Sequence, residues 1–206
     1  MRRNLLTCAA ALAAAFTISA CAPVGDPGPT RGDTTDMTSA PLSPAARVAA
    51  RSDEEVRFTA YLTGYSYWDN TPPGSAAIAH PVLRKSAGGT GTWEDPVTIA
   101  VGHRLEQGRQ SMDFPKGTRF YLSGLRKYAI VEDVCGDGPR PQDGPCHTGR
   151  DGRPWLDIYV DGSKSPRAAS EECMRRLTRF HEIIQNPAPD YPTVAGALTE
   201  TGCRVF

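Results

Sequence analysis

A series of short segments rich in β-branched and aromatic residues runs along the chain, and Gly, Pro, Asn or Asp bounds each of them. Such segments are typical of β-strands joined by tight turns. Residues 125–126, between two of these segments, are expected to form a hairpin connection. The predicted strands are residues 56–63, 76–80, 97–101, 118–123, 127–132, 156–160 and 180–185.

One helix is predicted among these strands. Ser165 is a suitable N-cap, Pro166 fits the first helical position, and an Ala-rich stretch with Glu residues continues to Arg176. Many short strands with a single helix favour an all-β domain built as a small barrel or a sandwich. The chain contains no internal repeat and no Gly-rich phosphate-binding loop.

The N-terminus has the features of an export signal. The basic residues Arg2 and Arg3 precede an apolar run at residues 5–16, which is shorter than the roughly 20 apolar residues that span a bilayer. The segment that ends at Cys21 resembles the bacterial lipobox. We therefore predict a signal peptide over residues 1–20 and a lipid anchor on Cys21 that holds the protein to a membrane. An ordinary secretory signal that leaves this cysteine unmodified is the alternative.

The segment after the signal, residues 21–54, is rich in Pro, Gly, Thr, Ser and Asp over most of its length. Such a composition buries too little apolar surface to offset the entropy of ordering the chain. We expect a flexible linker there, between the membrane and a folded domain at residues 55–206. The chain carries 23 basic and 23 acidic residues, and no basic stripe marks it as a nucleic-acid-binding protein.

The cysteines also restrict the fold. One of the 6 cysteines would leave with the signal peptide and another would carry the lipid, so an even number remains in an exported domain. Two disulfides are expected, and of the pairings that four cysteines allow we favour Cys135–Cys146 and Cys173–Cys203, because each closes a local loop. A zinc site is the rival interpretation, but the spacing lacks a C-x-x-C knuckle. The histidines form no ligand pair, so neither a metal nor another cofactor is predicted.

Two late segments carry a resemblance to a known family. The sequence KGTRFYLSGLRKYAIVEDVCG, followed by WLDIYVDG, resembles the three-aspartate (3D) domain, a group of double-psi β-barrels shared with membrane-bound lytic murein transglycosylases. This resemblance implies a six-stranded double-psi β-barrel and assigns functional aspartates to Asp133 and Asp157. The third aspartate of the pattern precedes a proline; Asp95 in GGTGTWEDPVTIAV fits it best, and Asp113 in MDFPKGT is the competitor.

An earlier segment extends the resemblance. The sequence TAYLTGYSYWDNTPPGSAAIAHP resembles the first strands of secreted barrels related to expansins and rare lipoprotein A. Within it, Tyr67, Trp68 and Asp69 are similar to the Tyr-Trp-Asp of family-45 glycoside hydrolases, in which the aspartate serves as a base. The chain departs from the 3D pattern in two places. Val-Cys-Gly follows Asp133 where the pattern has Gly-Gly-Ala, and a loop at residues 136–154 separates the two late strands.

The aspartates suggest cleavage of a glycosidic bond, which needs a carboxylic acid to protonate the leaving oxygen. We expect Asp133 and Asp157 to face one groove, where mutual repulsion raises the pKa of one of them. Asp157 would be the acid, and Asp133, with Asp95 or Asp69, would orient the substrate or stabilise charge. Capping of a turn is the structural alternative for each of these residues. Glu132 alternates with Asp133 and is expected to point to the opposite face, into solvent.

The aromatic residues and the aspartates together leave two main functions open. Tyr67 and Trp68 are the preferred candidates for stacking on sugar rings, because the sequence around them is loop-like. The first function is an enzyme that cleaves cell-wall polysaccharide such as peptidoglycan. The second is a non-catalytic, expansin-like polysaccharide-binding module, and a structural or protein-binding lipoprotein comes third. Each would be exported and lipid-anchored, facing the cell wall or periplasm; the sequence indicates no oligomeric state.

Overall fold

In a computed structural model of the chain, residues 43–44 and 54–206 are described, and all structural statements concern these residues. The predicted signal peptide, Cys21 and most of the predicted linker lie outside them. The described part consists mainly of short strands. These are β1 (Val56–Tyr65), β2 (Val97–Val101), β3 (His103–Glu106), β4 (Arg109–Met112), β5 (Arg119–Leu122), β6 (Lys127–Val134), β7 (Trp155–Tyr159) and β8 (Arg179–Gln185), accompanied by a 3-10 turn (Pro141–Asp143) and helices α2 (Pro145–Thr148) and α3 (Arg167–Leu177).

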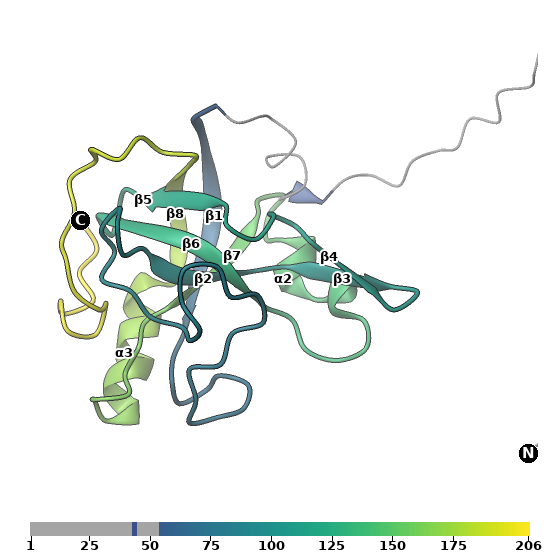
Figure 1. Cartoon of the computed structure of the whole chain (residues 1–206), viewed down its shortest axis with the longest axis horizontal. Helices are drawn as coiled ribbons and strands as arrows, with labels where there is room; N and C mark the ends of the chain where they lie inside the picture. Colours follow the sequence, from purple (N-terminus) through teal and green to yellow (C-terminus); the bar gives the residue numbers. More distant parts are fainter. Residues whose placement is uncertain (1–42, 45–53) are drawn as a thin grey trace, which may run out of the picture. The chain divides into compact units, whose positions relative to one another are not determined.

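Six of the strands form a closed barrel in the order β1-β7-β2-β6-β5-β8 (Figure 1). The pairs β1–β7 and β2–β6 are parallel, and the other neighbours are antiparallel. Parallel neighbours need long crossover connections, so strands from distant parts of the chain become adjacent. The prediction was an all-β, six-stranded double-psi barrel with a short helix and two disulfides. The structure confirms this fold class: the six-stranded barrel is closed, its strands run in mixed directions, and both disulfides are present.

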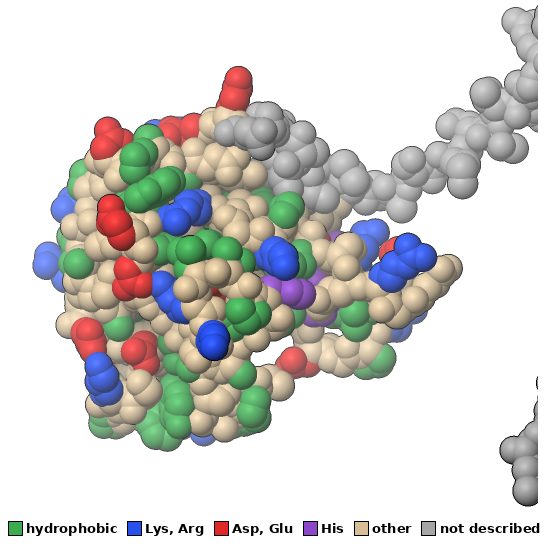
Figure 2. All heavy atoms as spheres, in the orientation of Figure 1, with side chains coloured by type: hydrophobic (Ala, Val, Ile, Leu, Met, Phe, Trp, Pro, Cys, Tyr) green, Lys and Arg blue, Asp and Glu red, His purple; other side chains and the backbone are tan. Residues whose placement is uncertain are grey.

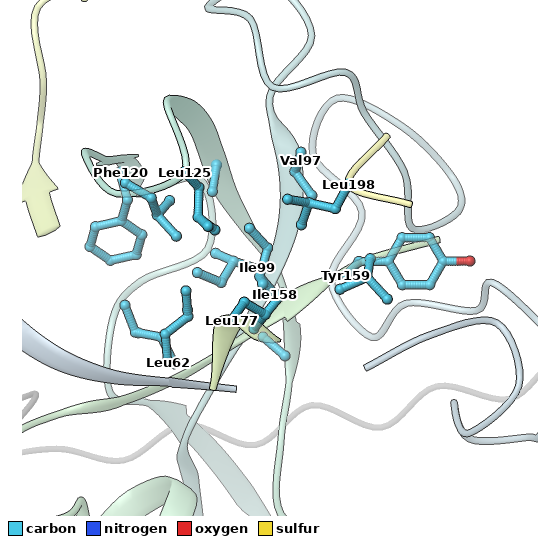
Figure 3. Packing of buried hydrophobic residues seen from close by; sticks show 14 of the residues in the cluster. Leu62, Val97, Ile99, Phe120, Leu125, Ile158, Tyr159, Leu177 and Leu198 are labelled. Carbon is cyan, nitrogen blue, oxygen red and sulfur yellow. The ribbon is translucent and has the colours of Figure 1, made fainter. Parts of the chain in front are cut away.

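Alternate residues of the strands fill the barrel interior. Leu62 of β1 and Ile158 of β7 are fully buried, and Figure 3 shows both packed near Leu177 of α3. Successive side chains of a strand point to opposite faces. Thr63, which follows Leu62, and Asp157, which precedes Ile158, therefore lie on the outer face of the barrel.

Two disulfides link the barrel to its surroundings, and both are the predicted pairs. Cys173 of α3 is joined to Cys203 in the C-terminal segment, with 5.2 Å between the Cα atoms. Cys135, which follows β6, is joined to Cys146 of α2, with 5.9 Å between the Cα atoms. The second bridge fixes the start of the loop that separates β6 from β7.

Two local predictions were wrong and one hairpin was missed. Residues 76–80 form no strand; they run as a loop beside β6, joined to it by the hydrogen bond from the His80 N–H to the Glu132 carbonyl oxygen (2.9 Å). The β3–β4 hairpin, beside α2 in Figure 1, was missed because its strands are largely polar. Helix α3 begins at Arg167, so Pro166 rather than Ser165 occupies the N-cap.

A one-residue shift in register between β2 and β6 decides which side chains face outwards. Ile99 pairs with Val131, but the next residue of β2, Ala100, pairs with Asp133, so Glu132 is an extra residue in β6. Such a bulge breaks the alternation of a strand and changes where its side chains point. Asp133 thereby faces the same side as Ala100, on the outer face of the barrel.

Candidate functional site

A cavity of about 460 Å³ lies against the outer face of the barrel, over β1, β7, β2 and β6. Segments 69–71 and 77–79 form one part of its wall, and segment 134–138 forms another. Its lining is acidic and includes no Lys or Arg among the described residues. The side chains that can do chemistry there are Tyr65, Asp69, His103, Asp133, Asp137 and Asp157.

The strand register brings two of the predicted aspartates into one row. Asp157 of β7 pairs with Ala100 of β2, and Ala100 pairs in turn with Asp133 of β6. Neighbouring strands lie about 4.8 Å apart, so the two aspartate Cα atoms are about 10 Å apart, with the small Ala100 side chain between them. Thr63 of β1 extends this row beyond Asp157. As predicted, the two carboxyl groups line one cavity.

Asp157 has the electrostatic character of a general acid. Burial raises the pKa of its carboxyl from 3.8 to about 7, and the negative charges of Asp69 and Asp133 act in the same direction. Only the hydrogen bond from the Thr63 hydroxyl to Oδ1 (2.7 Å) opposes this change by stabilising the anion. A carboxyl group with this pKa keeps its proton for a large part of the time near neutral pH.

Asp133 is held more rigidly than Asp157. Its Oδ2 accepts a hydrogen bond from the Tyr65 hydroxyl (3.0 Å), and its Oδ1 accepts hydrogen bonds from the backbone N–H groups of Ala79 (3.0 Å) and Val134 (2.9 Å). Burial raises its pKa, but these donors stabilise the carboxylate and counteract that effect. The pKa of Asp133 stays above its ordinary value, and the three hydrogen bonds fix its side chain in place and anchor the 76–80 segment.

The other two predicted aspartates differ in position. Asp69 lines the cavity and is exposed, although its Oδ1 caps a turn by accepting hydrogen bonds from the Ser66 N–H (2.7 Å) and hydroxyl (2.6 Å). Asp95 is not among the lining residues. It forms an ion pair with Arg84 and accepts a hydrogen bond from the Thr90 N–H (2.9 Å), which are the contacts of a turn residue. The structure thus brings three of the four predicted aspartates together.

Asp113, the competitor of Asp95, also lies away from the cavity wall. Its buried Oδ1 is 2.6 Å from Nδ1 of His147. Arg104 Nη2 donates to Nε2 of the same imidazole (3.1 Å), so Nδ1 carries the hydrogen that binds Asp113. This chain of contacts, buried at Asp113 and His147, connects β3 with α2 and stabilises the region next to the disulfide of Cys146.

The predicted sugar platform of Tyr67 and Trp68 does not line the cavity. Their rings pack edge to face, with centroids 5.5 Å apart, and Trp68 Nε1 donates to the Gly162 carbonyl oxygen (3.0 Å). A different aromatic row lies on the outer face. Trp155 and Phe180 flank Tyr61 on the adjacent strands β7 and β8, at centroid distances of 4.6 and 5.3 Å.

His103 is a cavity residue that the sequence interpretation missed. Its Nδ1 lies 3.2 Å from the carbonyl oxygen of Cys135 and must carry the hydrogen, because a carbonyl only accepts. Burial lowers the pKa of the imidazole, which keeps the ring neutral at neutral pH and leaves Nε2 as an acceptor. The sequence offered no signal for this role, since the position of His103 depends on the Cys135–Cys146 loop.

The prediction for Glu132 was wrong. Its side chain is fully buried, and Oε1 accepts hydrogen bonds from the backbone N–H groups of Val82 (3.2 Å), Leu83 (2.7 Å) and Arg84 (3.2 Å). Oε2 accepts a further hydrogen bond from the Thr98 hydroxyl (3.1 Å). The bulge turns Glu132 towards this loop, so it holds the segment that leads away from the cavity wall.

The surface and the described residues give three further findings. On the face drawn in Figure 2, acidic and basic side chains are interspersed, and histidine side chains gather near the middle. In the described part of the chain, no group of at least three His, Cys, Asp or Glu side chains is arranged to hold a metal ion. No described helix has the length and apolar character needed to cross a membrane.

The fold and the cavity define a class of protein: a disulfide-linked β-barrel domain with carboxyl groups on its outer wall. The chain belongs to the family described as the DDB_G0273701 N-terminal domain, which it matches over residues 57–204. It is 31% identical over 141 residues to "Uncharacterized protein DDB_G0273701/DDB_G0273221" of Dictyostelium discoideum. That alignment covers 68% of this chain and 56% of the relative, so the chain spans little more than half the length of that protein. No solved structure matches the chain.

Proposed function

We propose that the protein cleaves a polysaccharide in the acidic cavity, with Asp157 as the general acid. The observation that carries the proposal is the row formed by Asp157, Ala100 and Asp133. It places two carboxyl groups in one cavity on residues whose Cα atoms are about 10 Å apart, and the pKa of Asp157 is raised to about 7. Glycosidases use a protonated and an ionised carboxyl group in this way.

The proposed reaction transfers a proton from Asp157 to the glycosidic oxygen as the bond between that oxygen and the anomeric carbon breaks. The carboxylates of Asp133 and Asp69 stabilise the positive charge that develops on the sugar ring. A hydroxyl group of the same sugar, as in lytic transglycosylases, or a water molecule attacks the anomeric carbon. The proton that this nucleophile loses passes to His103 Nε2, which is an acceptor in the same cavity.

The proposed location and substrate rest on the sequence. The basic and apolar N-terminus with Cys21 supports export and attachment to a membrane, and the resemblance to the 3D domain supports cell-wall polysaccharide, peptidoglycan above all, as the polymer. The absence of Lys and Arg from the described cavity lining agrees with a substrate whose reacting part is uncharged.

A digest of purified wall preparations, with mass analysis of the products, tests this function. The wild-type protein should release oligosaccharides, and the masses distinguish an internal anhydro sugar from a product that has gained water. Asp157→Asn removes the acid and should reduce release by about 100-fold or more. Asp190→Asn is the matched control, because Asp190 is exposed. Equal release by wild type and Asp157→Asn would refute the assignment.

The aromatic row on the outer face supports a second candidate function, non-catalytic binding of polysaccharide. Phe180 has 41% of its surface exposed, and it continues the row of Tyr61 and Trp155, whose rings can stack on the apolar faces of sugars. A binding module would hold insoluble wall polymer in a pull-down without releasing product. Phe180→Ala should then weaken retention, whereas Asp157→Asn should leave it unchanged.

A further inference from the structure

Two side chains next to Asp157 form a chain of hydrogen bonds with a fixed direction. Trp155 Nε1 lies 2.8 Å from Thr63 Oγ1, and Thr63 Oγ1 lies 2.7 Å from Asp157 Oδ1. Trp155 and Asp157 are alternate residues of β7, and Thr63 pairs with Asp157 in the adjacent strand β1. The barrel wall itself therefore sets the positions of all three groups.

The chemistry of the donors orients this chain. An indole N–H only donates, so the oxygen of Thr63 must accept from Trp155. The hydroxyl hydrogen of Thr63 then has two possible acceptors, Asp157 Oδ1 at 2.7 Å and the Leu156 carbonyl oxygen at 3.5 Å. The first is at an ordinary hydrogen-bond distance and the second is beyond it, so Thr63 donates to Asp157 Oδ1.

We propose that Thr63 and Trp155 are positioning residues that keep Asp157 Oδ1 as an acceptor and confine the acidic proton to Oδ2. A carboxyl oxygen that receives a hydrogen from Thr63 cannot also direct its own proton towards that hydroxyl. The protonated form of Asp157 therefore carries its hydrogen on the other oxygen. This inference rests on the proposed function, because it specifies which atom of Asp157 delivers the proton to the glycosidic oxygen.

The opposite arrangement makes a different prediction. If Asp157 carried its proton on Oδ1 and donated to Thr63, the bond would stabilise the protonated acid. In the arrangement proposed here the bond stabilises the carboxylate. The other titratable groups that face Asp157 are Asp69, Asp133 and Tyr65, and substitution of Thr63 leaves all of them in place.

Titration of the Asp157 side-chain carbon by NMR in the full chain separates these two arrangements. Thr63→Val keeps the β-branched shape but removes the donor, so the pKa of Asp157 should rise by about one pH unit. Thr63→Ser restores the hydroxyl and should return the wild-type value. Trp155→Phe removes the donor that polarises the Thr63 hydroxyl and should raise the pKa by a smaller amount.

A fall in the Asp157 pKa in Thr63→Val, or no change, would overturn the proposal. If Thr63→Val does not fold, Trp155→Phe decides in the same way: a rise supports the proposal, and a fall or no change refutes it. The measurement needs no substrate, so its result is separate from the proposed function. If the pKa of Asp157 rises in Thr63→Val but the wild-type protein releases no sugar, glycan cleavage is refuted and the proton placement stands. If the wild type releases product but the pKa does not rise in Thr63→Val, only the proton placement is refuted.

Discussion

Asp157→Asn should make the protein more stable above neutral pH, although it removes the proposed catalytic acid. The asparagine oxygen can still accept the hydrogen bond from the Thr63 hydroxyl, which lies 2.7 Å from Asp157 Oδ1. The substitution therefore changes the charge of the side chain with little change in its shape. Its effect on stability follows from the raised pKa of Asp157.

The sign and size of the effect come from the two pKa values. The pKa of Asp157 is about 7 in the folded protein and 3.8 ordinarily. The folded state thus holds the proton more tightly, and the stability that this provides is lost as the pH rises from about 4 to above about 7. At 1.36 kcal/mol per pH unit, the loss is at most about 4 kcal/mol. Part of the Asp157 surface remains accessible to solvent, which screens its charge. We therefore expect a loss of unfolding free energy of about 2 kcal/mol.

Urea denaturation over a range of pH measures this difference. Wild type and Asp157→Asn should have similar unfolding free energies at about pH 3, where the side chain at position 157 is mostly neutral in both the folded and the unfolded state. The variant should become more stable by about 2 kcal/mol at about pH 8. Asp133 also has a raised pKa and is present in both proteins, so its own burial acts on both curves. Asp190→Asn should follow the wild type throughout.

A difference that does not change with pH would refute the reasoning. It would mean that Asp157 ionises in the folded protein as readily as in the unfolded chain. Such a carboxyl group would hold no proton near neutral pH, and the role of general acid would then be excluded together with the electrostatic account of the cavity.

Three further predictions concern stability, each measured by urea denaturation. Glu132→Ala removes a buried carboxylate that accepts from three backbone N–H groups and should cost about 3–5 kcal/mol, whereas Glu94→Ala at the surface should cost less than about 0.5 kcal/mol; a small loss in Glu132→Ala would contradict its anchoring role. Lys127→Met removes the donor to three carbonyl oxygens, those of Val194 and Gly196 in the C-terminal segment and that of Thr90, so it should cost about 2–3 kcal/mol and speed hydrogen exchange in the C-terminal segment; unchanged exchange would count against this contact. Replacing Cys173 and Cys203 by Ser opens a loop with a sequence separation of 30 and should cost about 3–4 kcal/mol, and full retention of stability would show that the bridge is dispensable.

The sequence alone predicted the barrel strands, both disulfides and several residues that line the cavity. Short segments bounded by Gly, Pro and Asn predicted all six barrel strands to within a few residues, because β-branched residues and turn residues act locally. The spacing of the cysteines favoured the two observed bridges, since short loops close with little entropy. The resemblance to the 3D domain singled out Asp133 and Asp157, which do share a cavity.

Only the tertiary structure decided how these residues face one another. One extra residue in β6 puts Asp133 opposite Ala100 and turns Glu132 into a buried anchor, and a shift of one residue reverses the faces of a strand. Thr63 reaches Asp157 only because β1 pairs in parallel with a strand far along the chain. Such register depends on the packing of the whole barrel, so no local pattern of residues could specify it.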